Sequence, residues 1–238
     1  MDGYLLIDKP KDWTSFDVVN YVRRMVQQHG LDVSTLQPGQ VRKKRFPAGH
    51  TGTLDPQATG LIVVLLGKYT KRAMELTKLD KTYQVTMKMG ETSTTGDVEG
   101  EKSVISGEVP TREALEVALA KFTGDIMQVP PIYSAMKVNG QRAYKLARAG
   151  KEVKLEARPT RIDSVNLESY EYPYAKFEVA VSSGTYIRSL VEDLGKELGT
   201  GAYMFDLRRT KVGRFDLADA ISVTGLTPDM LVARLKTL

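Results

Sequence analysis

One short segment, GHTGTLDPQATGL at residues 49–61, places a single carboxylate, Asp55, in a glycine-rich loop that leads directly into the apolar run LIVVLL. Glycine permits backbone angles that a side chain forbids, while Pro56 fixes its own φ and favours extended geometry at Asp55. The apolar run predicts a buried strand that braces the loop. An acid held in place suits a nucleophile or a general base. The same residues also suit an Asp-Pro turn that only connects two elements.

The composition restricts the chemistry available to this acid. The 238 residues contain no cysteine, which excludes disulfides, thiolate nucleophiles and cysteine-ligated metal centres. With His29 and His50 as the two histidines, a histidine-rich metal site and a Ser-His-Asp arrangement are both disfavoured. Counting residues leaves a carboxylate-bound Mg²⁺ open. The net charge of +5 favours an anionic partner without requiring one.

The N-terminal stretch does not resemble a targeting segment. Its apolar part, Tyr4 to Ile7, is far shorter than a signal-peptide core. No segment approaches the roughly 18 apolar residues that span a bilayer. We therefore expect a cytoplasmic protein without membrane contact.

Helical spacing and alternation predict the main elements. A helix is expected from Ser15, as its N-cap, to a stop near Gly30, and a second helix after the cap Thr111. Residues 83–89 alternate strictly between apolar and polar, which predicts a half-buried strand with Tyr83 on its apolar face. A further strand is expected at 177–181, followed by a helix capped by Thr185. Residues 31–47 read as an exposed loop whose basic run, Arg42 to Arg45, suits either a solvated surface or phosphate contacts.

Strands and helices are interspersed without regular β-α-β repetition. This pattern favours an α+β fold with a mixed, largely antiparallel central sheet and flanking helices. No internal repeat or low-complexity linker divides the sequence, so we expect a single catalytic domain over residues 1–238.

Five segments, in this order, resemble the TruB-type tRNA pseudouridine synthases: GHTGTLDPQATGL, KTY at 81–83, PPIYSAMKVNGQRAY at 130–144, GTYIRSL at 184–190 and LRRTKVG at 207–213. The resemblance spans roughly residues 3 to 221. It implies a pseudouridine synthase fold with an RNA-gripping insertion at about 124–152. It also implies isomerisation of a uridine to pseudouridine at position 55 in the T-loop of tRNA, with no cofactor and no metal. The expected partner is the T-arm and T-loop of tRNA, and no protein partner is implied, so we expect a monomer.

The resemblance also assigns roles to individual residues. It implies that Asp55 is the nucleophile, that Arg188 pairs with it and keeps it charged, and that Tyr83 stacks on the target base. A base within a folded loop must be flipped out before its glycosidic bond can be reached. Residues expected to bind the substrate are His50, Tyr186, Leu207, Lys9, Tyr133, Lys137, Arg142, Tyr144 and Arg148.

Several of these residues also suit purely structural roles. Arg188 suits an ordinary salt bridge, and Tyr83, Tyr186 and Leu207 suit core packing. The aromatic and basic stretch from Tyr133 to Arg148 also suits a mixed surface helix. A non-catalytic tRNA-binding module or RNA-folding chaperone is therefore the alternative function. A nucleotide-dependent enzyme is disfavoured because the glycine spacing matches neither GxxxxGK[ST] nor GxGxxG.

Three features depart from the family pattern, and the first is that the loop at residues 31–47 is longer than in many members. Asp12 stands where the family usually has glycine, so the turn after Lys9 and Pro10 is expected to differ locally. Many bacterial members continue into a C-terminal RNA-binding PUA domain beyond the position of Leu238, and we expect this chain to lack it. The loss of such phosphate contacts would weaken tRNA affinity more than catalysis.

Overall fold

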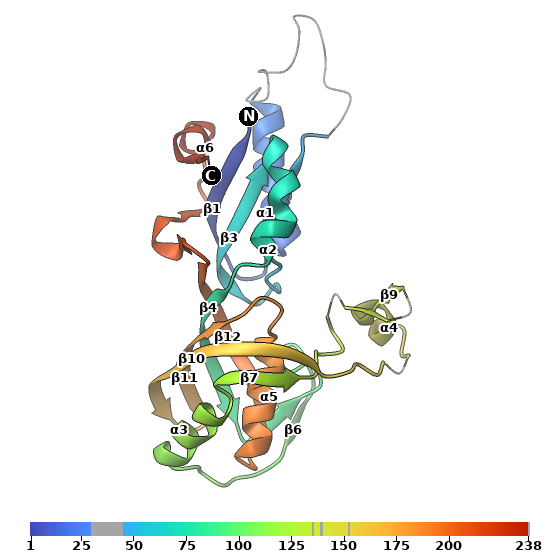
Figure 1. The fold of residues 1–238 in the computed structure, drawn as a ribbon, viewed down its shortest axis with the longest axis vertical. Helices are drawn as coiled ribbons and strands as arrows, with labels where there is room; N and C mark the ends of the chain where they lie inside the picture. Colours follow the sequence, from blue (N-terminus) through green and yellow to red (C-terminus); the bar gives the residue numbers. More distant parts are fainter. Residues whose placement is uncertain (30–44, 135, 139, 152, 238) are drawn as a thin grey trace, which may run out of the picture. The chain divides into compact units, whose positions relative to one another are not determined.

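The computed structural model describes residues 1–29, 45–134, 136–138, 140–151 and 153–237, which form two compact units (Figure 1). Unit 1 comprises Met1–Lys81 together with Arg208–Leu238, and unit 2 comprises Thr82–Leu207. Unit 1 is thus built from two stretches of chain separated by all of unit 2. The expected organisation, one catalytic domain without a PUA domain, stays a prediction.

A mixed sheet forms the centre of unit 1. Strand β1 (Gly3–Lys9) lies between β14 (Ile221–Ser222), which is parallel to it, and β3 (Thr59–Leu66), which is antiparallel. The remaining strands of this unit are β2 (Ala48–His50), antiparallel to β3, the end of β12 (Ala202–Val212), parallel to β3 at Arg208 and Arg209, and β13 (Phe215–Asp216), antiparallel to β12. Its helices are α1 (Ser15–Gln28), the 3₁₀ helix η2 (Gly67–Arg72), α2 (Ala73–Thr77), the 3₁₀ helix η3 (Leu217–Asp219) and α6 (Pro228–Arg234).

Strand β3 is buried on both faces, which explains its uninterrupted apolar sequence. Ile62, Val64 and Leu66 pack in one cluster with side chains of α1 and β1. Leu61 and Val63 point to a second cluster that includes Tyr4 and Phe215. The predicted buried strand that follows the acid-bearing loop is therefore confirmed.

The start of α1 differs from the prediction by one residue. Thr14, not Ser15, is the N-cap: its hydroxyl accepts from the Asp17 backbone N–H, and the Asp17 carboxylate accepts from the Thr14 backbone N–H. This reciprocal capping box satisfies two N–H groups at the helix start. Ser15 is thereby free to bond elsewhere. The end of the helix, with His29 as the C-cap, agrees with the prediction, while Gly30 lies outside the described residues.

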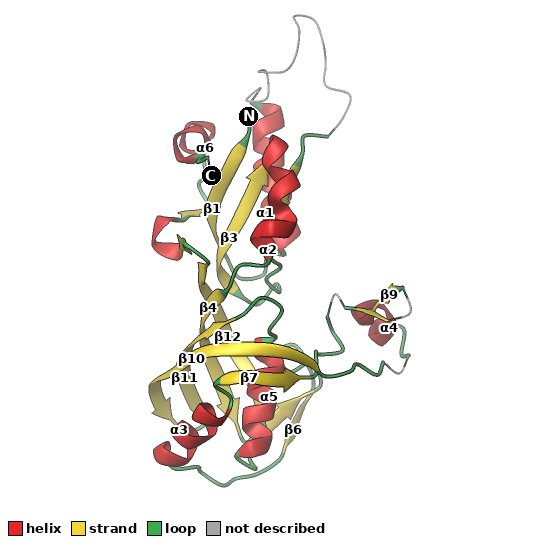
Figure 2. Ribbon diagram, viewed as in Figure 1, coloured by secondary structure: helices red, strands yellow, loops and turns green. Residues whose placement is uncertain are grey.

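Unit 2 contains a sheet with the strand order β12, β4, β11, β10, β7 (Figure 2). Its long strands are β4 (Lys81–Met89, whose first residue belongs to unit 1), β11 (Tyr174–Val181), β10 (Arg158–Glu171) and β7 (Gly124–Gln128), with β10 antiparallel to both β11 and β7. Two hairpins, β5 (Glu91–Ser93) with β6 (Lys102–Val104) and β8 (Lys137–Val138) with β9 (Gln141–Arg142), stand apart from this sheet. The helices are α3 (Arg112–Lys121), α4 (Ala143–Arg148) and α5 (Ile187–Glu197). The predicted α+β class with a mixed, largely antiparallel sheet is confirmed.

The burial of β4 follows the alternation in its sequence. Tyr83, Val85, Met87 and Met89 are buried, and the residues between them are half-buried. Thr111 caps α3 as predicted, because its hydroxyl accepts from the Ala114 N–H. The predicted cap of α5 is wrong.

At the start of α5 the N-cap is Tyr186, and the hydroxyl of Thr185 donates to the Ser182 carbonyl instead. Because Tyr186 carries no short polar side chain, the helix start has no side-chain cap of its own. The side chain of Gln128, at the end of β7, bonds the Tyr186 backbone instead.

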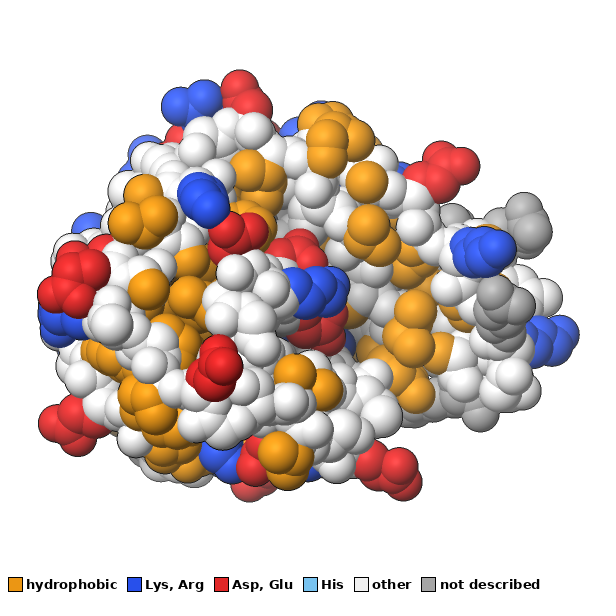
Figure 3. Space-filling view, turned by 90° about the horizontal axis from the view of Figure 1, so that it is seen from below, with side chains coloured by type: hydrophobic (Ala, Val, Ile, Leu, Met, Phe, Trp, Pro, Cys, Tyr) orange, Lys and Arg blue, Asp and Glu red, His pale blue; other side chains and the backbone are white. Residues whose placement is uncertain are grey.

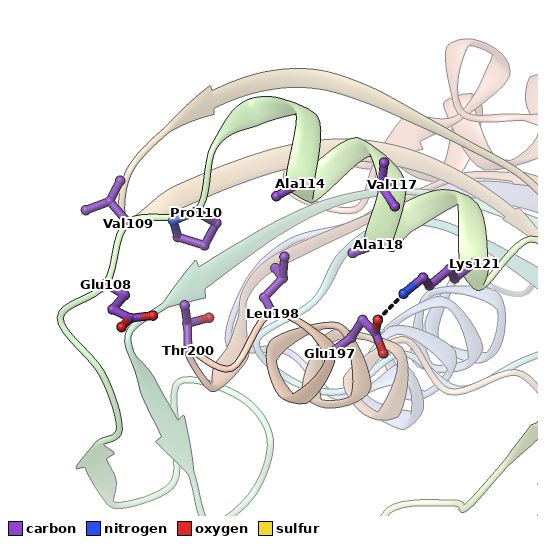
Figure 4. A pocket seen from close by; sticks show the side chains of 10 residues that line it. All are labelled: Glu108, Val109, Pro110, Ala114, Val117, Ala118, Lys121, Glu197, Leu198 and Thr200. Atoms are coloured by element: carbon purple, nitrogen blue, oxygen red, sulfur yellow. Dashed lines mark hydrogen bonds and ion pairs between the residues drawn. The ribbon is translucent and has the colours of Figure 1, made fainter.

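A cavity of about 310 Å³ lies between α3 and the end of α5 (Figure 4). Apolar side chains such as Val117 and Leu198 line it, and an ion pair between Lys121 and Glu197 lies at one side. None of its lining residues belongs to the predicted site.

The surface seen in Figure 3 carries acidic and basic side chains interspersed with apolar ones. The described part of that face therefore has no uniformly basic area. In the part of the chain that the structure describes, no helix is both long enough and apolar enough to cross a membrane.

Candidate active-site residues in the two units

The loop that carries Asp55 connects β2 to β3 in unit 1. At its start the Thr51 N–H donates to the Val63 carbonyl over 3.2 Å, and after the acid the Ala58 N–H donates to the Asp55 carbonyl over 3.1 Å. Asp55 itself is half-buried. The loop backbone is therefore attached to the buried strand at one end and closed on itself after Asp55. The fixed placement of the carboxylate itself stays a prediction.

Lys9 is hydrogen-bonded to the backbone of this loop. The ammonium donates to the carbonyls of Pro10, Trp13 and Pro56 over 2.9, 2.6 and 3.1 Å, and the side chain is fully buried at 0% exposure. Burial lowers the pKa of Lys9 to about 8, and the nearby charge of Asp55 opposes that shift. Lys9 thus joins the acid-bearing loop to the turn after β1. Its predicted contact with the substrate stays a prediction.

Arg209 holds the other side of the loop, and the sequence reasoning assigned it no role. Its Nε donates to the Leu61 carbonyl over 2.7 Å and its Nη2 to the Gly52 carbonyl over 3.1 Å, with the side chain 2% exposed. Gly60 has a φ of +101°, and a Cβ there would come within 2.3 Å of the Arg209 carbonyl oxygen. A glycine is required at this close approach. The signal was present in LRRTKVG, although nothing local distinguishes which arginine is buried.

Further charged groups surround Arg209 in unit 1. Lys81 is buried, its ammonium donates to the carbonyls of Thr77 and Leu79, and burial lowers its pKa to about 8. The neighbouring Arg208 forms a two-pronged pair with Asp8, at 3.1 and 2.7 Å. A Cβ at Gly52 would lie 3.4 Å from Arg209 Nη1 and 3.9 Å from Lys81 Cε, so these two cationic side chains lie beside the loop.

His50, on β2, is half-buried and turned toward the same loop. Its Nδ1 accepts from the Gly52 N–H over 3.3 Å. Burial lowers the pKa of His50 from its ordinary value of 6.5, the charge of Arg209 lowers it further, and the hydrogen bond to Gly52 opposes both. The imidazole is therefore neutral at pH 7. A neutral ring suits hydrogen bonding or stacking more than phosphate pairing, and contact of His50 with RNA stays a prediction.

Arg188 lies in unit 2, in the first turn of α5, and is 7% exposed. Its guanidinium donates to the carbonyls of Thr95 and Tyr133 over 3.3 and 2.9 Å, and its Nη1 lies 3.8 Å from the buried carboxylate of Asp97. Burial raises the pKa of Glu192, one turn further along the helix. Within unit 2 the guanidinium thus contacts two carbonyls and one carboxylate. Since Asp55 belongs to unit 1, its pairing with Arg188 stays a prediction.

Three further predicted residues also belong to unit 2. Tyr83 on β4 and Leu207 on β12 are each 8% exposed, and Tyr186 before α5 is half-buried. The structure therefore brings Tyr83, Tyr186, Arg188 and Leu207 into one unit, and Lys9, His50 and Asp55 into the other.

The predicted RNA-gripping residues lie in the segment that follows β7. Tyr133 is half-buried and Arg142 is exposed at the end of β9. The backbones of Lys137, Tyr144 and Arg148 are placed in β8 and α4, and their side chains lie outside the description. Of the basic run, Arg45 is exposed and donates to Asn20 Oδ1, while residues 42–44 lie outside the described residues.

The sequence matches two family descriptions in succession. Residues 41–187 match the TruB family pseudouridylate synthase N-terminal domain, and residues 188–235 match the tRNA pseudouridylate synthase B C-terminal domain. A tRNA pseudouridine synthase B from Pseudomonas aeruginosa is 44% identical over 226 residues, which cover 95% of this chain and 69% of that protein. The chain belongs to the TruB family of pseudouridylate synthases. Another TruB-family relative, tRNA pseudouridine synthase B from Parabacteroides distasonis, is 42% identical over 90% of this chain and 86% of its own length.

Solved structures support the fold of this TruB-family chain. A Cbf5-Nop10-Gar1 complex contains a chain that aligns with a TM-score of 0.68 at 29% identity, covering 95% of this chain and 54% of that one. An H/ACA RNP bound to a substrate RNA containing 2'-deoxyuridine gives 0.65 at 26% identity, with coverages of 95% and 52%. The chain thus spans about half the length of these solved relatives. The predicted pseudouridine synthase fold is confirmed.

The described residues contain no group of three or more histidine, aspartate or glutamate side chains that could hold a metal ion. The expectation of a reaction without metal or cofactor stays a prediction.

Proposed function

We propose that this TruB-family chain converts the uridine at position 55 in the T-loop of tRNA to pseudouridine, with Asp55 as the nucleophile. The observation that carries the proposal is the attachment of the Asp55 loop by the buried Lys9, by Arg209 and by β3. A reaction that needs one carboxylate in a fixed orientation gains from such a support, because positioning removes part of the entropic barrier.

The reaction is an isomerisation and consumes no second substrate. The bond between ribose C1' and uracil N1 breaks, a bond between C1' and C5 forms, and the proton leaves C5 while N1 gains one. A nucleophilic carboxylate divides this exchange into two easier steps. Whether it attacks the ribose carbon or the ring, or promotes a glycal, is left open.

The remaining residues are proposed to serve this step. Arg188 pairs with the Asp55 carboxylate and keeps it charged, and Tyr83 stacks on the flipped base and assists proton removal. Flipping costs a few kcal/mol, which stacking and hydrogen bonding offset. Tyr186, Leu207 and His50 line the pocket around the flipped nucleotide.

The segment after β7 is proposed to grip the T-arm. It offers Tyr133 and Tyr144 for stacking, together with Lys137, Arg142 and Arg148 for phosphate contacts. We further expect the enzyme to act as a monomer in the cytoplasm.

Tritium release from 5-tritiated uridine in unmodified tRNA tests the function. The chain should release tritium, Asp55→Asn should reduce kcat by several orders of magnitude, and the exposed Asp163→Asn on β10 should retain wild-type turnover. A tRNA with cytidine at the target position should release nothing.

Two results would contradict the proposal. Full turnover by Asp55→Asn would exclude this acid as the nucleophile. Tight tRNA binding without tritium release or pseudouridine by mass spectrometry would favour the non-catalytic tRNA-binding module or chaperone.

A further inference from the structure

Hydrogen bonds join the end of β7 and the residues that follow it to the start of α5. Some of the donating side chains belong to β7 and others to α5. Gln128, the last residue of β7, donates from Nε2 to the Tyr186 carbonyl over 3.1 Å and accepts at Oε1 from the Tyr186 N–H over 2.8 Å. Ser189 donates from Oγ to the Val129 carbonyl over 2.7 Å. Arg188 donates to the Tyr133 carbonyl over 2.9 Å. Residues 128–133, here called the insertion root, thus hold the helix turn that carries Arg188.

These bonds are shielded from water. Gln128 is 3% exposed, Ser189 is 4% exposed and Arg188 is 7% exposed. A buried amide or hydroxyl without a partner still carries the free-energy cost of its removal from water. These pairs therefore strongly favour the arrangement in which each group is bonded.

Hydrogen bonds contribute much of the contact between the insertion root and α5, because a cavity limits the close packing of side chains there. A cavity of about 330 Å³ lies beside the insertion root, lined by Val129, Pro131 and Tyr133 from the root and by Ser189 and Glu192 from α5. Where a cavity adjoins two segments, fewer side-chain contacts oppose a shift of one against the other. The polar pairs therefore set the register of the root on the helix.

Gln128 also fixes the backbone of the N-cap residue of α5. The start of α5 has no side-chain cap of its own, and Tyr186 is bonded through both backbone groups to one amide located 58 residues earlier. The orientation of the first turn of α5, which includes Arg188, thus depends on where the insertion root lies.

We infer that Gln128 and Ser189 are positioning residues that couple the insertion to Arg188, so that RNA held by the insertion fixes the guanidinium for the reaction. The inference rests on the proposed function, because it assigns a catalytic purpose to Arg188. Neither residue is expected to touch the substrate. Each acts through the first turn of α5.

The kinetic test separates turnover from binding. Gln128→Met removes both bonds to Tyr186 at nearly constant side-chain length, and Ser189→Ala removes the bond to Val129. We expect the rate constant of tritium release under single-turnover conditions to fall at least about fivefold for each variant. The Kd for tRNA should remain within about twofold, because the phosphate contacts are retained.

Matched variants distinguish positioning from general destabilisation. Ser189→Thr keeps the hydroxyl at a position that lines the adjoining cavity, and the rate should recover. Ser103→Ala, at an exposed position in β6, should be neutral. Val179→Ala in the buried face of β11 lowers stability without touching the insertion root. If it lowered the single-turnover rate as much as Ser189→Ala at an equal loss of Tm, the coupling would be refuted.

Amide hydrogen exchange supplies a readout that does not require turnover. Wild-type protein is mixed with tRNA carrying cytidine at the target position, and exchange is followed in the peptide covering residues 184–190. RNA should slow exchange there in the wild type and have little effect in Gln128→Met. An equal RNA-induced slowing in both proteins would overturn the inference.

The two proposals fail in different ways. If wild-type protein forms no pseudouridine but its α5 amides respond to RNA through Gln128, the coupling stands and the proposed function fails. If wild-type protein is active while both variants retain the full single-turnover rate, the function stands and the coupling fails.

Discussion

Ser15 and Leu54 are joined by two hydrogen bonds that run in opposite directions. The Leu54 N–H donates to Ser15 Oγ over 2.7 Å, and Ser15 Oγ donates to the Leu54 carbonyl over 2.9 Å. Both residues are 3% exposed. One hydroxyl at the start of α1 therefore satisfies both backbone groups of the residue that precedes Asp55.

Ser15→Ala should loosen the Asp55 loop. The substitution leaves a buried N–H and a buried carbonyl without partners, which costs about 1–3 kcal/mol of unfolding free energy. Because misplacement of a reacting group by about 1 Å can cost about 100-fold in rate, kcat should fall more than stability alone explains. Urea unfolding and tritium release measure the two effects. Ser222→Ala, at an exposed position on β14, is the control, and equal kcat for Ser15→Ala and wild type would contradict the expectation.

Arg209→Met should destabilise unit 1. The side chain is 2% exposed and donates to the carbonyls of Leu61 and Gly52, and its removal takes one buried donor from each. We expect a loss of about 2–4 kcal/mol in urea unfolding. Arg214→Met removes an exposed guanidinium that lies over the Phe215 ring, and it should cost less than about 1 kcal/mol. Similar losses for the two variants would show that the loop contacts of Arg209 contribute little.

Stability should rise with pH because of Lys9. Its pKa is about 8 in the folded protein and 10.5 ordinarily, so between these values the unfolded chain binds more protons than the folded one. The free energy of unfolding then increases with pH through this window, whereas below about pH 8 both states carry the proton and the full burial cost is present.

Urea midpoints at about pH 7.5, 8.5 and 9.5 measure this dependence. The wild type should gain stability relative to Lys9→Met as pH rises, and the rise that remains in Lys9→Met should reflect Lys81, whose pKa is also about 8. The charge of Asp55 raises the pKa of Lys9, so Asp55→Asn should shift the start of the window to lower pH. Parallel curves for wild type and Lys9→Met would refute the assignment.

Asp12→Gly should be tolerated. Among the described residues, Asp12 is the one non-glycine residue with a positive φ, at 66°, and its carboxylate accepts from Gln57 Nε2 over 3.1 Å. Glycine relieves about 1 kcal/mol of backbone strain and loses an exposed bond of similar worth, so Tm should change little. Asp12→Val should cost about 1–2 kcal/mol, because a β-branched residue tolerates this conformation poorly. A large loss of stability for Asp12→Gly would instead make the Gln57 bond essential.

Sequence patterns correctly predict elements whose formation depends on neighbouring residues in the chain. The alternation in β4, the apolar run of β3 and the cap Thr111 all appear in the structure as expected. The cap predicted at Ser15 is wrong by one residue, although Thr14 and Asp17 have the spacing of a capping box in the sequence.

Long-range contacts account for what could not be predicted. Thr185 is a good capping residue, yet Gln128 reaches the start of α5 from elsewhere in the sequence and fixes Tyr186 in that place. Lysine and arginine are seldom fully buried, so the supporting positions of Lys9 and Arg209 behind the Asp55 loop have no signature in composition or spacing. Asp12 has a positive φ, which glycine adopts more readily, and the residue type alone could not reveal this. That the turn differs from the family's stays a prediction.

The division of the chain also sets an order of events during synthesis on the ribosome. Unit 2 ends at Leu207, whereas unit 1 needs Arg208 and Arg209 on β12 and Ile221 on β14 to complete its sheet. Unit 2 can therefore finish folding while the first 81 residues still wait for their partner strands. During that interval the nascent LIVVLL segment lacks its later partner strand β12, so this apolar stretch is exposed to contacts that a chaperone would prevent.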